Sequence, residues 1–114
     1  MPYIRVETSS APLNAKNMLF RTSAFVAEKL GKDERWVMVS IVPNVPMVYG
    51  ASSELAAYVR LESIGLKAEQ CPALAASLCD FLQGELAVSK ARMYIHFVDL
   101  DARFFGWNGK TFGK

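Results

Sequence analysis

The sequence predicts an α/β (α+β) fold in which two β-α-β units form a mixed four-stranded sheet with two helices on one face. The chain has 114 residues, which favours a single domain over residues 1–114. Its hydrophobic pattern reads strand–helix–strand twice. Residues 30–42 and 86–98 resemble each other, since each leads from a helix end through a short polar loop into an apolar strand. Right-handed crossovers make the strands of each unit parallel and place both helices on the same face.

The first unit begins with a strand over residues 3–8, where the residues alternate and include β-branched side chains. A helix follows, with Ser10 as its expected cap and Pro12 near its first turn, and it ends before Gly31. Residues 36–42 are almost continuously apolar, which predicts a strand buried on both faces. The expected apolar face of the helix comprises Ala15, Leu19, Val26 and Leu30.

The second unit is expected to contain a strand over residues 55–63, a helix over residues 69–86 and a strand over residues 93–99. A short strand is also expected over residues 47–49, before this unit. Residues 104–112 suit short turns and short strands because glycine and Asn-Gly interrupt them. The inner face of the second helix is expected to comprise Cys71, Leu74, Leu78 and Leu82.

The composition argues against several classes of function. The 13 Lys and Arg residues are spread along a chain of net charge +2, which disfavours a nucleic-acid-binding protein. No apolar run approaches the ~20 residues that span a bilayer, and no signal peptide is recognisable, so a cytoplasmic protein without a membrane partner is expected. Hydrophobic residues make up 52% of this small chain. We expect the sheet face without helices to be apolar and covered by another subunit.

The two cysteines do not indicate a disulfide or a metal site. Cys71 and Cys79 are eight residues apart on the expected second helix, which is about 12 Å and too far for a disulfide. With a single histidine elsewhere, they do not form a metal-binding constellation, and no metal or other cofactor is predicted. Buried or half-buried thiols are the expected role.

Pro2 is the candidate catalytic residue. Initiator methionine is commonly removed before a small residue, which would leave Pro2 with a free secondary amine. An α-amino group has a pKa far below that of lysine, and desolvation or a nearby cation lowers it further. Such an amine can act as a general base next to a carbonyl group. Many chains begin with Met-Pro for no chemical reason, so the remaining residues decide between the two interpretations.

The whole chain resembles the tautomerase superfamily, specifically the branch of macrophage migration inhibitory factor (MIF) and D-dopachrome tautomerase. The order and spacing of several short segments carry this resemblance. These segments are Met1-Pro2, Gly31-Lys32, Val42-Pro43, Gly50-Ala51-Ser52-Ser53-Glu54, Ser63-Ile64-Gly65, Arg92-Met93-Tyr94-Ile95, Gly106-Trp107-Asn108 and Thr111-Phe112.

The resemblance implies a homotrimer with active sites between subunits and a cofactor-free keto–enol tautomerase acting on small aromatic α-keto acids such as phenylpyruvate. It implies that Pro2 is the base, that Lys32 binds substrate oxygens and lowers the pKa of Pro2, and that the Ile64 backbone binds substrate. Tyr94 would come from the neighbouring subunit. The other residues implied near the site are Ser63, Phe105, Trp107 and Phe112.

Other roles for these residues are also consistent with the sequence. Lys32 follows a helix-ending glycine and could simply compensate the helix dipole. Tyr94 could be a core residue with a satisfied hydroxyl, and Trp107 and Phe112 could pack a C-terminal hairpin.

Four departures from the family pattern affect the expected function. Residues 56–59 replace a Cys-x-x-Cys pair, so redox activity is not expected. His96 stands where an asparagine is usual, on the same strand face as Tyr94, either as a titratable pocket group or as an ordinary hydrogen-bonding residue. Phe105 is bulkier than the usual aliphatic residue. Asn44 replaces an acidic residue used in receptor engagement, which weakens a cytokine role.

The alternative function is a MIF-like trimeric signalling or protein-binding module in which the proline chemistry is vestigial. Such a protein could also be secreted without a signal peptide. The enzyme is the preferred interpretation because Pro2, Lys32, Ile64 and Tyr94 are all present.

Overall fold

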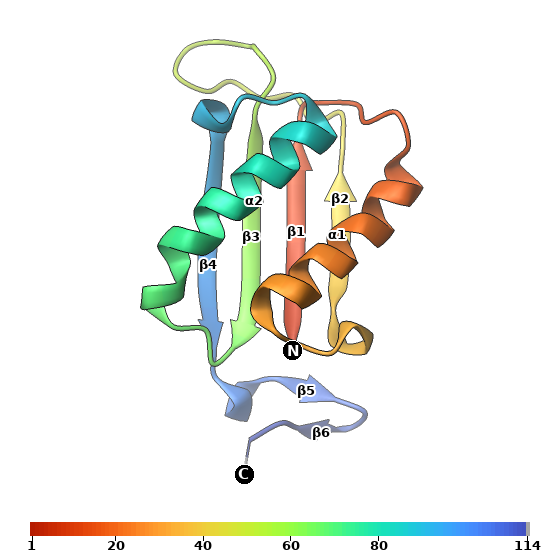
Figure 1. Ribbon diagram of the computed structural model, residues 1–114, viewed down its shortest axis with the longest axis vertical. Helices are drawn as coiled ribbons and strands as arrows, with labels where there is room; N and C mark the ends of the chain where they lie inside the picture. The colour runs from red at the N-terminus through yellow and green to blue at the C-terminus, as the bar shows by residue number, and fades with distance from the viewer. Residues whose placement is uncertain (114) are drawn as a thin grey trace.

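The computed structural model describes residues 1–113, which form a four-stranded sheet with two helices on one face, as Figure 1 shows. The predicted α/β fold is therefore confirmed. The strands and helices are β1 (Pro2–Thr8), α1 (Ala15–Leu30), β2 (Met38–Val42), β3 (Ala57–Ile64), α2 (Cys71–Leu86), β4 (Met93–Leu100), β5 (Gly106–Trp107) and β6 (Lys110–Thr111).

The sheet has the strand order β2-β1-β3-β4. β1 and β2 are parallel, as are β3 and β4, whereas β1 and β3 pair antiparallel at the centre. Each parallel pair is joined by one helix, so the two predicted β-α-β units are present and meet along β1 and β3. This arrangement brings the start of β1 beside the end of β3, since Pro2 is paired with Ser63.

Helix α1 begins later than the sequence predicted. Its cap is Asn14, whose side chain accepts a hydrogen bond from the Asn17 amide at 3.1 Å. Ser10 is not the cap, because it is buried and its Oγ donates to the Leu86 carbonyl at 2.6 Å. Pro12 consequently lies before the helix rather than in its first turn. The helix ends as predicted at Gly31, which adopts the left-handed conformation with a φ of 62°.

The buried face of α1 is also rotated from the expected one. Met18, Thr22 and Val26, spaced four residues apart, point into the core, whereas Ala15 is exposed. Thr22 is compatible with burial because its hydroxyl donates to the Met18 carbonyl at 2.7 Å. A polar residue therefore stands in the core stripe, which a pattern based on apolar residues alone does not reveal.

Helix α2 packs against the sheet through a buried stripe of leucines, Leu74, Leu78, Leu82 and Leu86. The predicted inner face is confirmed for three of these leucines, although Cys71 is only half-buried at the helix start. Cys71 and Cys79 both lie on α2 and are free thiols, as expected. The core between helices and sheet is completed by residues of the two central strands, including Ile4, Val6, Val59 and Leu61.

Two predicted strands are shorter or absent. Glu34–Trp36 forms a 3₁₀ turn capped by the Asp33 side chain, so β2 begins only at Met38. β2 is an edge strand, and Met38 is 61% exposed, so the prediction of burial on both faces is wrong for this chain. Residues 47–49 contribute only an isolated bridge between Tyr49 and Ser52.

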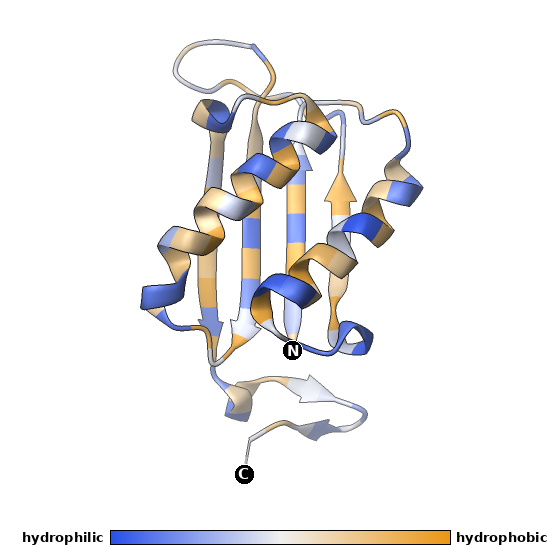
Figure 2. Ribbon diagram, in the orientation of Figure 1, coloured by the Kyte–Doolittle hydropathy of each residue, from blue (hydrophilic) through white to orange (hydrophobic). Residues whose placement is uncertain are grey.

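The sheet face opposite the helices is open but not apolar, contrary to prediction. Figure 2 shows hydrophilic bands alternating with hydrophobic ones along β1 and β3. On this face Arg5 pairs with Glu7, and Arg60 pairs with Glu62. The large exposed apolar side chains on this face include Met38, Tyr58 and Tyr94. A partner on this face would therefore meet ion pairs as well as apolar surface.

The C-terminal segment forms the predicted short strands. β5 and β6 pair antiparallel and lie beyond the end of the main sheet that also carries the N-terminus (Figure 1). Within residues 1–113, no helix combines the length and the apolar character needed to cross a membrane.

Candidate active site

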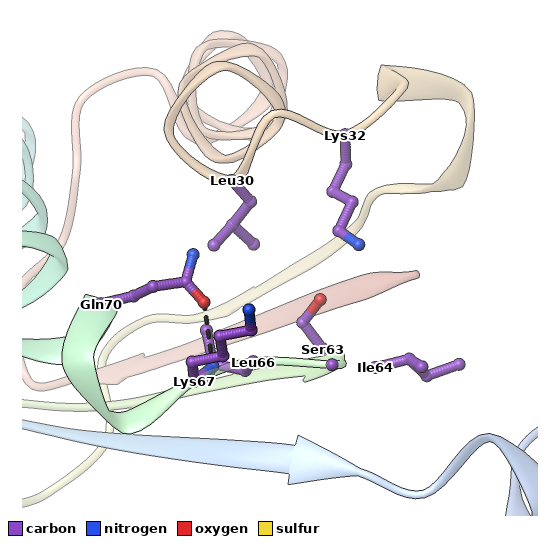
Figure 3. A pocket seen from close by; sticks show the side chains of 8 residues that line it. Leu30, Lys32, Ser63, Ile64, Leu66, Lys67 and Gln70 are labelled. Carbon is purple, nitrogen blue, oxygen red and sulfur yellow. Dashed lines mark hydrogen bonds between the residues drawn. The ribbon is translucent and has the colours of Figure 1, made fainter.

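A cavity of about 390 Å³ opens where α1 ends and β3 leaves the sheet (Figure 3). Three elements build it: the end of α1 with the following turn, the end of β3, and the 3₁₀ turn η2 (Ala68–Gln70) with the residues before it. Its lining comprises Leu30, Lys32, Ser63, Ile64, Gly65, Leu66, Lys67 and Gln70. The sequence-predicted residues Lys32, Ser63 and Ile64 therefore share one cavity.

Ser63 connects this cavity to Pro2. Pro2 is fully buried and lies directly opposite Ser63 in the antiparallel register of β1 and β3. Ser63 is 1% exposed, and its Oγ has no hydrogen-bond partner within residues 1–113. Figure 3 shows this oxygen directed toward the space below Lys32 and Leu30. A buried hydroxyl without a partner costs about 1–3 kcal/mol, and a ligand that hydrogen-bonds to it would recover that energy.

Lys32 makes the cavity electropositive. Its backbone amide closes the end of α1 by donating to the Ala27 carbonyl at 3.0 Å, while its side chain extends toward Ser63 (Figure 3). Desolvation by burial, and secondly the charge of Lys32, lower the pKa of the Met1 α-amino group. The charge of Lys32 therefore disfavours a protonated amine at the chain terminus.

Tyr94 and His96 do not reach this cavity within one chain. Both are exposed on the open sheet face, and Tyr94 is 58% exposed. In the register of β3 and β4, Tyr94 lies beside Tyr58 and His96 beside Arg60, whereas Ser63 lies farther along β3. The prediction that Tyr94 and His96 share a face is confirmed.

The predicted rim aromatics form a cluster with a residue that the sequence analysis did not include. The ring of Trp36 lies 4.7 Å from that of Trp107 and 6.1 Å from that of Phe112, both edge-on. Phe112 also stacks with Trp107 at 6.2 Å and with Phe105 at 6.1 Å. Phe105, Trp107 and Phe112 are therefore brought together, but none of them lines the Lys32 cavity. Trp36 was missed because it was assigned to a strand.

Lys67 and Gln70 were also missed. Lys67 lies in the connection before the expected second helix, and Gln70 lies in the first turn of that helix, which was expected over residues 69–86. Gln70 accepts a hydrogen bond from the Lys67 amide at 2.9 Å, which fixes the turn against the cavity (Figure 3). The available signal was proximity in sequence, since Lys67 follows Ile64 by three residues.

Comparison with known proteins identifies the family of this chain. The family model described as "Macrophage migration inhibitory factor (MIF)" matches residues 1–113. The chain belongs to the MIF family. A MIF homologue of Brugia malayi is 36% identical over 99% of this chain and 100% of its own length. A MIF homologue of Trichinella spiralis is 36% identical over 98% of this chain and 100% of its own length.

Solved structures give the same assignment. The MIF homologue from Prochlorococcus marinus superposes with a TM-score of 0.90 at 35% identity, covering 97% of this chain and 99% of that chain. The MIF of Trichinella spiralis also gives 0.90, at 34% identity, covering 96% of this chain and 98% of that chain. The MIF family includes tautomerases and proteins with cytokine-like roles.

Within residues 1–113, no group of three or more His, Cys, Asp or Glu side chains is arranged to hold a metal ion.

Proposed function

We propose that this chain is a cofactor-free keto–enol tautomerase for small aromatic α-keto acids of the phenylpyruvate type, with Pro2 as its general base after Met1 is removed. The observation that carries this proposal is the position of Pro2. It is buried opposite the unpartnered hydroxyl of Ser63 and beside a cavity to which Lys32 supplies positive charge.

The proposed reaction begins with the substrate carboxylate or carbonyl oxygen bound by Lys32. The neutral Pro2 nitrogen removes a proton from the carbon next to the carbonyl group. Negative charge then develops on the carbonyl oxygen, where the Lys32 ammonium and the Ser63 hydroxyl favour it. The prolinium returns the proton to the oxygen, and the enol leaves. The backbone of Ile64 contributes a hydrogen bond to the substrate.

The proposed active form is a homotrimer with its sites between subunits. Tyr94 and His96 lie on the open sheet face of their own chain, so a neighbouring subunit is needed to bring them to a Lys32 cavity. The aromatic cluster of Phe105, Trp107 and Phe112 would form the rim. We expect about three subunits per particle in sedimentation at micromolar concentration, and a stable monomer would contradict this assembly.

The test is a turnover assay on protein whose N-terminus has been identified by mass spectrometry. Loss of the phenylpyruvate enol is followed by absorbance, with and without the protein. A Pro2→Ala variant, which keeps a free amine but changes it from secondary to primary, provides a control for the nature of the base. Absence of turnover in trimeric protein beginning at Pro2 would overturn the proposal and favour a signalling or protein-binding module. The predicted cytoplasmic location stays a prediction.

A further inference from the structure

The wall of the cavity opposite Lys32 carries a second lysine with no role in the proposed proton transfer. Lys67 precedes the 3₁₀ turn η2, and its side chain lines the cavity together with that of Gln70. Figure 3 shows Lys32 reaching in from the end of α1, whereas Lys67 extends from the opposite side, where β3 ends. The two ammonium groups therefore approach the same space from different elements.

In the part of the chain that the structure describes, neither lysine is paired with a carboxylate, although Asp99 lies at the edge of the cavity, where it accepts a hydrogen bond from the Gly65 amide at 3.1 Å. Within residues 1–113, neither Lys32 nor Lys67 forms a salt bridge, although six other ion pairs are present. The eight residues that line the cavity include these two lysines and no aspartate or glutamate. Two like charges facing one cavity without a carboxylate favour an anionic ligand.

The uncharged polar groups of the cavity also favour a ligand rich in acceptors. The buried Ser63 hydroxyl has no partner and can donate a hydrogen bond. The Gln70 side-chain oxygen is already used by the Lys67 amide at 2.9 Å, which leaves the Gln70 amide nitrogen as the free group. Figure 3 shows that nitrogen turned away from the bonded oxygen and toward Leu30. The side chains thus offer mainly donors.

We infer that the substrate carries two anionic groups, namely the α-keto carboxylate held by Lys32 and a second carboxylate held by Lys67. This inference rests on the proposed function and names the substrate class of the same site. A single carboxylate shared by both lysines is less favoured, because the lysines enter from opposite walls of a cavity of about 390 Å³. That volume is enough for a small molecule with a carboxylate at each end.

The experiment compares two substrates with the same enolisable carbon, phenylpyruvate and its para-carboxy derivative. Steady-state kcat and KM are measured for the unmodified protein, Lys67→Met and Lys67→Arg. Lys16→Met is the matched control, because Lys16 is exposed near the start of α1 and does not line the cavity. All variants are first shown to have the same oligomeric state.

We expect the unmodified protein to have a KM about tenfold lower for the dianion than for phenylpyruvate, as one charge-assisted contact at an exposed lysine allows. Lys67→Met should abolish this difference by raising only the KM of the dianion, with kcat unchanged. Lys67→Arg should retain most of the preference, and Lys16→Met all of it. An equal rise in both KM values, or no change, would overturn the inference.

If neither compound is turned over, the proposed function fails and the second-anion site is tested separately. Cinnamate and 4-carboxycinnamate, which cannot enolise, are titrated into the protein and followed by NMR. Tighter binding of the dicarboxylate that is lost in Lys67→Met and retained in Lys16→Met supports the inference. Equal affinity for the two compounds, or a preference that survives in Lys67→Met, overturns it.

Discussion

The ring of Tyr94 stacks on the ring of Tyr49, with 4.8 Å between their centroids and 22° between their planes. Tyr49 is itself contacted by Arg92, whose guanidinium lies 5.0 Å from the ring centroid and donates to the Tyr49 carbonyl at 3.0 Å. Arg92 also donates to the carbonyls of Ser52, Glu54 and Leu55 at 3.0–3.1 Å. One side chain therefore fixes the loop that orients Tyr94.

Replacing Arg92 with lysine should lower the free energy of unfolding by about 2–3 kcal/mol, measured by urea denaturation. An ammonium group cannot reproduce the planar fork that reaches four carbonyl oxygens, so some of them lose their partner. Arg21→Lys is the control, because Arg21 makes a bidentate pair with Glu85 at an exposed position. Arg21→Lys should lower the free energy of unfolding clearly less than the lysine substitution at Arg92 does. Equal losses for both variants would show that the loop does not depend on Arg92.

Replacing Ser63 with alanine should separate stability from binding. The variant removes a buried hydroxyl that has no partner. The free energy of unfolding should therefore stay the same or rise by about 1 kcal/mol. Affinity for an enol or keto acid should fall about tenfold, because the ligand loses a hydrogen bond. Thermal unfolding and ligand titration on the same preparation test both parts. A large loss of stability would mean that the hydroxyl is satisfied within the folded protein.

The sequence predicted the fold well because the helices and strands of both β-α-β units have clear hydrophobic periodicity. The leucine stripe of α2 and the alternation of β1 follow directly from the helical and strand periods. The errors lie where a polar side chain is satisfied by a distant partner. Ser10 is an example, since its hydroxyl bonds to Leu86, which lies 76 residues away in the sequence. Such a contact leaves no periodic signal.

Only the part of the site that is built by neighbouring elements of one chain is present in this structure as predicted. Ser63 and Lys32 share a cavity because β3 and the end of α1 flank the start of β1. Tyr94 and His96 were predicted from family resemblance, and a single chain does not place them there. Lys67 had no periodic or motif signal, because a connecting turn has no preferred spacing of functional side chains.

Retention of Met1 should nearly abolish tautomerase activity. With Met1 present the Pro2 nitrogen is part of an amide, which has no basic lone pair, and the nearest free amine belongs to Met1. The two forms can be prepared from one expression with and without methionine aminopeptidase and identified by mass spectrometry. Their kcat/KM values should differ by at least about 100-fold, the usual contribution of a general base. Equal activity would exclude Pro2 as the base.

The pH dependence of kcat/KM should follow deprotonation of the Pro2 amine. In the structure, burial and then Lys32 lower the pKa of the α-amino group at Met1, and both effects penalise a charged amine at Pro2 in the same direction. A base with a lowered pKa is protonated and inactive below that pKa. Activity should therefore rise with pH through a value below the ordinary α-amino range of roughly 7.7–8.0.

Lys32→Ala should raise the apparent pKa of the Pro2 amine, because the variant removes the nearby positive charge that lowers it. Burial, the larger cause of the lowered pKa, stays in place. The apparent pKa should thus recover only part of its depression, while KM rises because the substrate loses its cation. His96, the single histidine of the sequence, lies on the open sheet face beside Arg60 of β3, with Tyr58 and Glu62 also on β3 and Tyr94 on its own strand β4. His96→Asn is therefore measured alongside. An ionisation that persists in His96→Asn and is seen by a nitrogen-15 label on Pro2 assigns the base, whereas one that disappears with His96 assigns the proton transfer to the histidine.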